Sequence, residues 1–455
     1  VAMVYDGLIG AMAGSSLTLS GGIDNTGNRQ IIFPVAGTVN LASAVSANAY
    51  ELVKYGAGTL NITAAQTAQL GTNTGIIVHA GKVSFSGAGI LSTATKAYAL
   101  RPGSVLEVLD NGATPLNNRL GAASNIDFKG GQLNLIGNAN GATLETLATP
   151  TFGRGFSIVT VTAQAGQQAN LVFSGAAGAQ ANAQNSGTGP TAPSVLFRGT
   201  ALGTAAGAGI ATIKDAAGFS FNGQTGATAT TTKGILPWAL VDVTTTGMGT
   251  SFATGDAAAA TATTANLRPL AANEYSTVNT IAANNNVLLT TGTTVAAANV
   301  APNSLTIEGN ANLALNNGVI LNLISGGILV RAGSVSTISG GLFNQTNGFS
   351  PLNLWTIGDL TITSPINGGN GISSGAMAVI KAGAGTLTLA PTTTSLNGLS
   401  GAAHSSMNGQ YVLNDGTLKA GTGLTNVLGA GNYFALNGGT LDLNGTSQMV
   451  YGFFS

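Results

Sequence analysis

The chain has 455 residues but no cysteine, and it is poor in charge. The lack of thiols excludes disulfide crosslinks and thiolate metal sites. Charged residues make up 7% of the sequence, against roughly 25% in an ordinary soluble domain. The 15 Lys and Arg residues balance 15 Asp and Glu residues. We expect no nucleic-acid partner, because the electrostatic attraction on which such binding depends is missing. Zero net charge also favours association between copies.

Long apolar runs and helical patterns are missing as well. The longest apolar run lies near residues 318–330, where Asn322, Ser325 and two glycines interrupt it. It is too short and too polar to cross a bilayer, so we expect no transmembrane segment. No basic leader precedes an apolar stretch at Val1, and we expect that any signal peptide has been removed. The alanine-rich residues 256–267 lack an apolar stripe and are predicted to form a loop.

What the chain does contain is glycine, 67 residues, and a repeat. The segment "KAGAGTLTL" at 381–389 nearly reproduces "KYGAGTLNI" at 54–62. Both include the pattern Gly-x-Φ-x-Φ, where Φ is apolar. The pattern begins at residues 58, 81, 104 (with serine first) and 131, and again at 385, 416 and 439. A period of twenty-odd residues is typical of a solenoid.

Each repeat reads as a short strand that follows a corner. Alternating apolar residues predict a strand with one buried face, and the preceding glycine allows the positive φ that a sharp corner requires. Coils of this kind bury their apolar faces only by stacking. The inward residues are predicted to be Leu60, Ile62, Val83, Phe85, Leu106, Val108, Leu133 and Leu135.

The predicted fold is therefore all-β, a β-solenoid of the right-handed parallel β-helix type with inserted loops. We expect one continuous solenoid over residues 1–455, with regular coils at 1–150, longer loops at 151–300 and regular coils again at 301–455.

The repeat also carries a family resemblance. The segments "KAGAGTLTLAP" (381–391), "NDGTLKAG" (414–421) and "NVLGAGNYFALNGGTLDLNGTSQ" (426–448) resemble, in that order, the autotransporter-associated β-strand repeat of large exported bacterial surface proteins. Residues 106–147, 195–211 and 355–369 are similar to other segments of such proteins. The resemblance implies a secreted passenger region at the cell surface and no catalytic residues. The sequence ends at "MVYGFFS" (449–455), where the repeat would run on, as expected for a fragment or a processed unit of a longer protein.

Enzymes built on parallel β-helices need acidic or basic residues stacked on one outer face. The outward positions of the repeat are mixed, and no two neighbouring coils present paired acids. Glu107 and Asp127 are close in sequence but fall in different columns. We therefore expect no enzyme activity and no catalytic site. The outward residues are Asn61, Ser84, Glu107, Asn134, Thr388, Lys419 and Asp442.

Other candidate residues have simpler structural interpretations. His79 and His404 lack a second ligand at metal spacing, so both are predicted to be corner residues that bond to backbone. The "GISSG" at 371–375 lacks the strand-to-helix context of a nucleophile elbow. The "GGNG" at 368–371 lacks the aspartate of calcium-binding glycine repeats. We expect no metal and no cofactor. Trp238 and Trp355 lie in apolar runs, which favours packing over sugar stacking.

The predicted function is structural: an extracellular or cell-surface β-solenoid that self-associates into fibres or a coat, or serves as an adhesin stalk. Open edges of terminal coils pair with other chains unless capped. The apolar residues Met449, Val450, Tyr451, Phe453 and Phe454 would otherwise face water. The alternative is a carbohydrate-binding or carbohydrate-degrading β-helix, which would contact polysaccharide.

Overall fold

A computed structural model of the chain confirms the predicted fold class: the protein is an all-β solenoid of stacked parallel strands. The only helical element among the described residues is one 3-10 turn, η1 (Ala272–Glu274). The structure describes residues 5–25, 29–45, 49–66, 70–91, 97–175, 178–179, 192–216, 218–219, 221–256, 265–296, 299–344, 351–367, 378–392, 410–428, 433–450 and 452–454.

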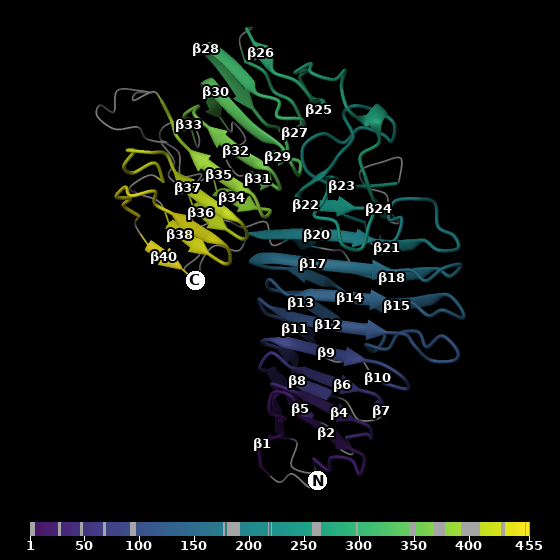
Figure 1. Cartoon of the computed structure of the whole chain (residues 1–455). Helices are drawn as coiled ribbons and strands as arrows, with labels where there is room; N and C mark the ends of the chain where they lie inside the picture. Colours follow the sequence, from purple (N-terminus) through teal and green to yellow (C-terminus); the bar gives the residue numbers. More distant parts are fainter. Residues whose placement is uncertain are drawn as a thin grey trace.

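The coils form two stacks, which we call the N-arm (residues 5–269) and the C-arm (residues 286–454). Figure 1 shows that the N-arm rises as one column and that the C-arm folds back beside its upper end. Each arm has its own hydrophobic core. The molecule is therefore bent at an elbow.

Two sheets face each other across the N-arm core. The first N-arm sheet contains, in spatial order, β1 (Gly7–Leu8), β3 (Gln30–Pro34), β5 (Ala49–Tyr55), β8 (Leu70–Val78), β11 (Ala97–Leu100), β13 (Asn125–Phe128), β16 (Pro150–Phe152) and β19 (Gly178–Ala179). The second N-arm sheet contains β2 (Ser16–Leu19), β4 (Thr38–Leu41), β6 (Thr59–Ile62), β9 (Gly81–Phe85), β12 (Ser104–Leu109), β14 (Gln132–Ile136), β17 (Gly155–Thr162), β20 (Pro193–Gly199), β22 (Leu236–Asp242), β23 (Ser251–Gly255), β24 (Ala265–Pro269), β21 (Ala211–Asp215), β18 (Ala169–Phe173) and β15 (Thr143–Leu147). A separate pair joins β7 (Ala65–Gln66) and β10 (Ile90–Leu91).

The C-arm repeats this plan with two sheets. The first C-arm sheet contains β25 (Asn286–Leu289), β27 (Ser304–Ile307), β29 (Gly327–Val330), β31 (Leu352–Thr356), β34 (Ala378–Ala382), β36 (Gln410–Leu413), β38 (Tyr433–Leu436) and β40 (Gly452–Phe454). The second C-arm sheet contains β26 (Thr293–Val295), β28 (Leu313–Asn322), β30 (Val335–Asn344), β32 (Asp359–Ile362), β35 (Thr386–Leu389), β37 (Thr417–Ala420) and β39 (Thr440–Asp442), and β33 (Ile366–Asn367) also pairs with β30.

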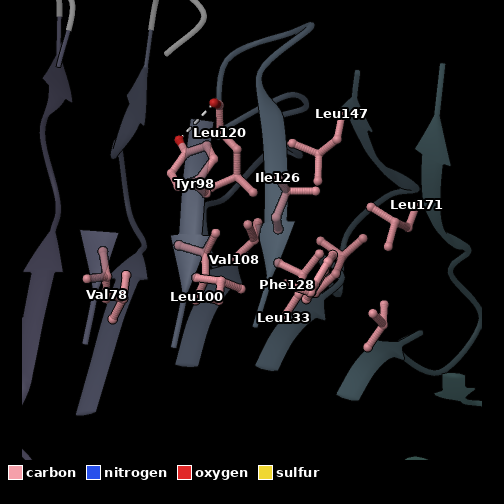
Figure 2. Packing of buried hydrophobic residues seen from close by; sticks show 14 of the residues in the cluster. Val78, Tyr98, Leu100, Val108, Leu120, Ile126, Phe128, Leu133, Leu147 and Leu171 are labelled. Atoms are coloured by element: carbon pink, nitrogen blue, oxygen red, sulfur yellow. Dashed lines mark hydrogen bonds between the residues drawn. The ribbon is translucent and has the colours of Figure 1, made fainter. Parts of the chain in front are cut away.

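The predicted inward residues stack in columns. Leu60 pairs with Val83, Val83 with Leu106, and Leu106 with Leu133 along adjacent parallel strands. All eight inward residues named from the sequence are at most 1% exposed. Figure 2 shows how side chains of the facing sheets meet in the same core, where the Tyr98 hydroxyl donates to the Leu120 carbonyl at 2.8 Å. The predicted register is confirmed.

The upper end of the N-arm is closed by antiparallel strands. β22, β23 and β24 form a meander, and β24 pairs antiparallel with β21. The meander therefore links β20 to β21 across the end of the solenoid and covers the edges of these two strands, on which another coil could stack. The prediction of a loop at 256–267 is wrong for its last three residues, because Ala265–Leu267 belong to β24. Pairing with β23 and β21 overrides the weak local pattern there.

The elbow is a packed interface. On the outer face of the first C-arm sheet, Leu329 and Trp355 meet Leu196, Leu240 and other apolar residues of the N-arm. The Trp355 indole N–H donates to the Pro237 carbonyl at 2.9 Å. Further hydrogen bonds cross between the arms. Among them, Arg331 Nε donates to the Thr250 carbonyl at 2.7 Å, and Asn414 Nδ2 donates to the Ala192 carbonyl at 2.8 Å and to Ser194 Oγ at 2.9 Å. The arms are therefore held together at several coils.

Truncation of one inward leucine tests the register. We expect Leu133→Ala to lower the free energy of local opening by about 2–5 kcal/mol, because it leaves a cavity in a filled column. Solenoids can open coil by coil, so amide hydrogen exchange of β12, β14 and β17 is the measurement. Asn134→Ala, on the outward side of the same strand, should change it by under about 0.5 kcal/mol. Equal effects of the two substitutions would contradict the register.

The elbow can be tested by removing its anchors. We expect the double variant Trp355→Ala and Asn414→Ala to let the arms separate while both cores stay folded, since each arm has its own core. Small-angle X-ray scattering should then show a larger radius of gyration with an unchanged far-ultraviolet circular dichroism spectrum. Trp238→Phe, inside the N-arm core, is the control. An unchanged radius of gyration in the double variant would argue against these anchors.

Candidate functional site

The two glycines of the repeated segment have separate roles. Gly56 and Gly383 carry the positive φ of the corner, at 79° and 84°. The predicted positive φ directly before the strand is confirmed at Gly81, Gly416 and Gly439, at 67°, 72° and 80°. It is wrong for Gly58 and Gly385, which lack a positive φ. A Cβ on Gly58 would lie 2.1 Å from the Gly37 carbonyl oxygen, so backbones of adjacent coils touch there. This contact, in addition to turn geometry, explains the second glycine.

The lysine of the repeated segment points inward. Lys54 and Lys381 replace apolar residues in core columns and are at most 1% exposed. Lys54 Nζ donates to the carbonyls of Tyr55, Gly56 and Ala80, at 2.6–3.2 Å. Lys381 Nζ donates to the carbonyls of Ala382, Gly383 and Asp415, the first and last at 3.1 and 2.9 Å.

Each lysine therefore ties its own corner to the next coil. Burial lowers the pKa of Lys54 to about 8. Burial also lowers the pKa of Lys381 to about 7, opposed by the charges of Asp415 and Asp359. The repeated segment recurs because the same three-carbonyl corner is built once in each arm.

The outward residues form columns, as the repeat predicts. Asn61, Ser84, Glu107 and Asn134 lie on neighbouring strands of the second N-arm sheet. Glu107 forms an ion pair with Lys82 at 2.9 Å and accepts a hydrogen bond from Ser84 Oγ at 2.9 Å. Ser84 is 2% exposed although it points outward, because these neighbours cover it.

The C-arm continues the same pattern. Thr388, Lys419 and Asp442 occupy neighbouring strands of the second C-arm sheet, and Lys419 pairs with Asp442 at 3.1 Å. A backbone hydrogen bond from Asn444 and one from the Lys419 side chain lower the pKa of Asp442. Asp127 lies on the first N-arm sheet, away from the Glu107 column, and pairs with Lys129 at 2.6 Å. The acids in these columns thus face basic partners.

His79 lies at a corner, as predicted, but its ring contact is with an aromatic side chain. It stacks on Tyr55 with ring centroids 4.3 Å apart and planes 9° apart. Burial and the Arg101 charge lower the pKa of His79, and Glu51 opposes them. His404 and the segments 368–371 and 371–375 lie outside the described residues.

Both tryptophans pack against apolar neighbours, which confirms that prediction. Trp238 lies in the N-arm core beside Phe152, with ring centroids 5.5 Å apart. Trp355 belongs to the elbow interface, a role that its sequence context alone did not indicate.

A buried ionic cluster in the N-arm was not predicted. Arg119 Nη2 pairs with Asp110 at 2.9 Å, and both side chains are fully buried. Glu145 accepts the backbone N–H groups of Arg119 and Leu120 at 2.9 and 3.0 Å. Burial raises the pKa of Glu145 to about 7 against these hydrogen bonds. The cluster fixes the loop between β12 and β13 and is closed to solvent.

The coils at two ends of the solenoid leave core columns uncovered. β1 and β2 each pair with a single strand, and the inward Ile9, Leu17 and Leu19 are only partly buried. β39 and β40 are likewise edge strands. Phe453 stacks on Phe434 at the end of an inward column and is 54% exposed. We call these the N-arm open end (β1 and β2) and the C-arm open end (β39 and β40).

Among the residues that the structure describes, no group of three or more His, Asp or Glu side chains is placed to hold a metal ion. No helix in the described ranges has the length and apolarity needed to span a membrane. No known protein family, curated protein or solved structure matches this chain.

The buried lysine makes the stability of the C-arm depend on pH. The pKa of Lys381 is about 7 in the fold, against 10.5 ordinarily. Between these pH values the unfolded chain holds more protons, so the free energy of unfolding should rise with pH. One group contributes at most about 1.4 kcal/mol per pH unit.

Denaturation followed by Trp355 fluorescence between pH 7 and pH 10 measures this slope. Lys381→Met should remove the contribution. Lys419→Met, whose lysine is on the surface, should keep it. Lys54, whose pKa is also lowered, leaves a smaller slope in Lys381→Met; a slope as steep as that of the native chain would contradict this role of Lys381.

Proposed function

We propose that this chain is an extracellular structural protein of a bacterial surface or matrix, and that its two-armed solenoid associates end to end. The observation that carries the proposal is the pair of open ends. Each presents an unpaired strand edge beside an exposed core column. The family resemblance of the repeat and the charge-poor composition support the location and the structural role.

Strand edges near the elbow are covered by other parts of the chain, whereas those of the two open ends are not. This difference supports a role of the open ends in association. The N-arm is closed above by the antiparallel meander β22–β24. At the start of the C-arm, the N–H groups of Ser276 and Asn279 donate to carbonyls of β25 at 2.8 and 2.9 Å and so cover its edge. The chain itself thus covers the upper end of the second N-arm sheet and the edge of β25, although β19 and β26 are also edge strands. We infer that strand addition is favoured at the two open ends, where an edge strand adjoins an uncovered core column.

The two open ends are structurally compatible. β40 and β1 both belong to first sheets, and β39 and β2 both belong to second sheets. Parallel pairing of β40 with β1 of another copy would satisfy main-chain donors and acceptors and cover Phe453. Zero net charge removes the long-range repulsion between copies that would otherwise oppose contact.

Sedimentation velocity over a range of concentrations tests the proposal. We expect the average sedimentation coefficient to rise with concentration. Phe453→Lys should abolish the rise, because a charge placed in the joint is costly to desolvate. Val335→Lys is a matched control, since Val335 is 66% exposed and lies away from both ends. A single slow species at every concentration, or association that persists in Phe453→Lys, would contradict end-to-end assembly.

A carbohydrate-binding solenoid is the second candidate function. It is favoured by one observation, the row of basic and aromatic residues at the His79 corner.

A further inference from the structure

One corner of the N-arm gathers an excess of basic side chains in a chain with little charge. Tyr55, the last residue of β5, and the residues that follow β8, β11 and β13 occupy equivalent positions on successive coils. Backbone hydrogen bonds set this register: the N–H groups of His79, Arg101 and Lys129 donate to the carbonyls of Lys54, Val78 and Leu100 at 2.8–3.0 Å. We define the corner ladder as Tyr55, His79, Arg101 and Lys129, together with Arg154, which lies one residue past Gly153, the equivalent position after β16.

The corner ladder is accessible and carries a positive charge. Tyr55 is 43% exposed, Arg154 is exposed, and the Lys129 side chain is 35% exposed. Asp127 is the one acid paired with the ladder, through Lys129. Among the described residues Arg101 and Arg154 have no ion-pair partner. Three of the chain's 15 basic residues thus stand along one edge, and the acids near them are Asp127 and Glu51, whose charge acts on His79.

The side chains of the ladder are hydrogen-bond donors. Arg101, Lys129 and Arg154 are cationic donors of the kind that bind carboxylates in charge-assisted hydrogen bonds, and the Tyr55 hydroxyl and the His79 ring offer neutral partners. Adjacent coils lie about 4.8 Å apart. A row of donors at that interval matches a linear ligand with one carboxylate on each sugar.

From this arrangement we propose that the corner ladder binds a linear acidic polysaccharide laid along the solenoid axis. A nucleic acid fits less well. Duplex DNA carries a charge about every 1.7 Å, far denser than the ladder. Single strands bind through bases stacked on open aromatic faces. Here the Tyr55 and His79 rings stack on each other and leave no gap between them for a base.

Fluorescence anisotropy with a labelled oligogalacturonate tests the site at low salt, at protein concentrations where sedimentation shows one species. We expect the double variant Arg101→Gln and Lys129→Gln to weaken binding about tenfold or more. The control is Lys82→Gln with Lys419→Gln. This control also removes two surface charges. Lys82 and Lys419 are 37% and 36% exposed, close to Lys129, and each pairs with an acid as Lys129 does.

Binding by the native chain, lost in the ladder variant and kept in the control, supports the proposal. Three results would overturn it: no binding by the native chain, equal losses in both double variants, or equal binding of a neutral dextran oligomer. Tighter binding of oligo-dT through the same residues would also overturn it in favour of nucleic acid. Circular dichroism and thermal unfolding confirm that each variant is folded, and the outcome does not depend on end-to-end association.

Discussion

Stacking of the coils requires the backbones of adjacent coils to approach closely at the glycine corners. Coils can pair as parallel strands only if their corners stack as well, and a Cβ on Gly385 would lie 2.2 Å from the Gly358 carbonyl oxygen. At these corners the glycines have no side chain, and backbone carbonyl groups point toward the core and need hydrogen-bond donors. At two corners a lysine from a core column satisfies these carbonyls and reaches the next coil. The segment repeated in both arms encodes this arrangement of glycines and lysine.

Much of the N-arm could be predicted because its strands alternate strictly. The alternation predicted which residues of β6, β9, β12 and β14 face inward, and their columns follow from it. Lys54 and Lys381 could not be assigned this way. A charged lysine in a strand of alternating apolar residues is normally assigned to the outward face. The structure shows instead that its aliphatic chain fills the core column while its ammonium group bonds to the corner carbonyls.

The elbow was missed for a different reason. The repeat pattern predicts strands with one buried face, whereas the strands at the elbow are buried on both faces. A signal was present in the sequence: "LPWALV" at 236–241 and "GILV" at 327–330 are apolar without alternation, as expected for strands covered on two sides. The stacked pair Tyr55–His79 joins residues 24 positions apart. Its detection requires the coil register, which the variable spacing of the repeat obscures in this part of the chain.

These features describe a neutral scaffold with two distinct kinds of surface. Its outward columns hold amides, hydroxyls and paired charges, which suits a hydrated surface. Its open ends present strand edges and core side chains, which suits contact with another solenoid end. The corner ladder runs along the side of the N-arm and leaves the ends free, so polysaccharide contact and end-to-end association are compatible in one molecule.

Electron microscopy of the purified chain can show both the elbow and the association of the ends. We expect bent particles with two arms, joined at their ends into chains in which the bend recurs once per copy. Straight rods would contradict the elbow. Isolated bent particles at every concentration would contradict end-to-end assembly.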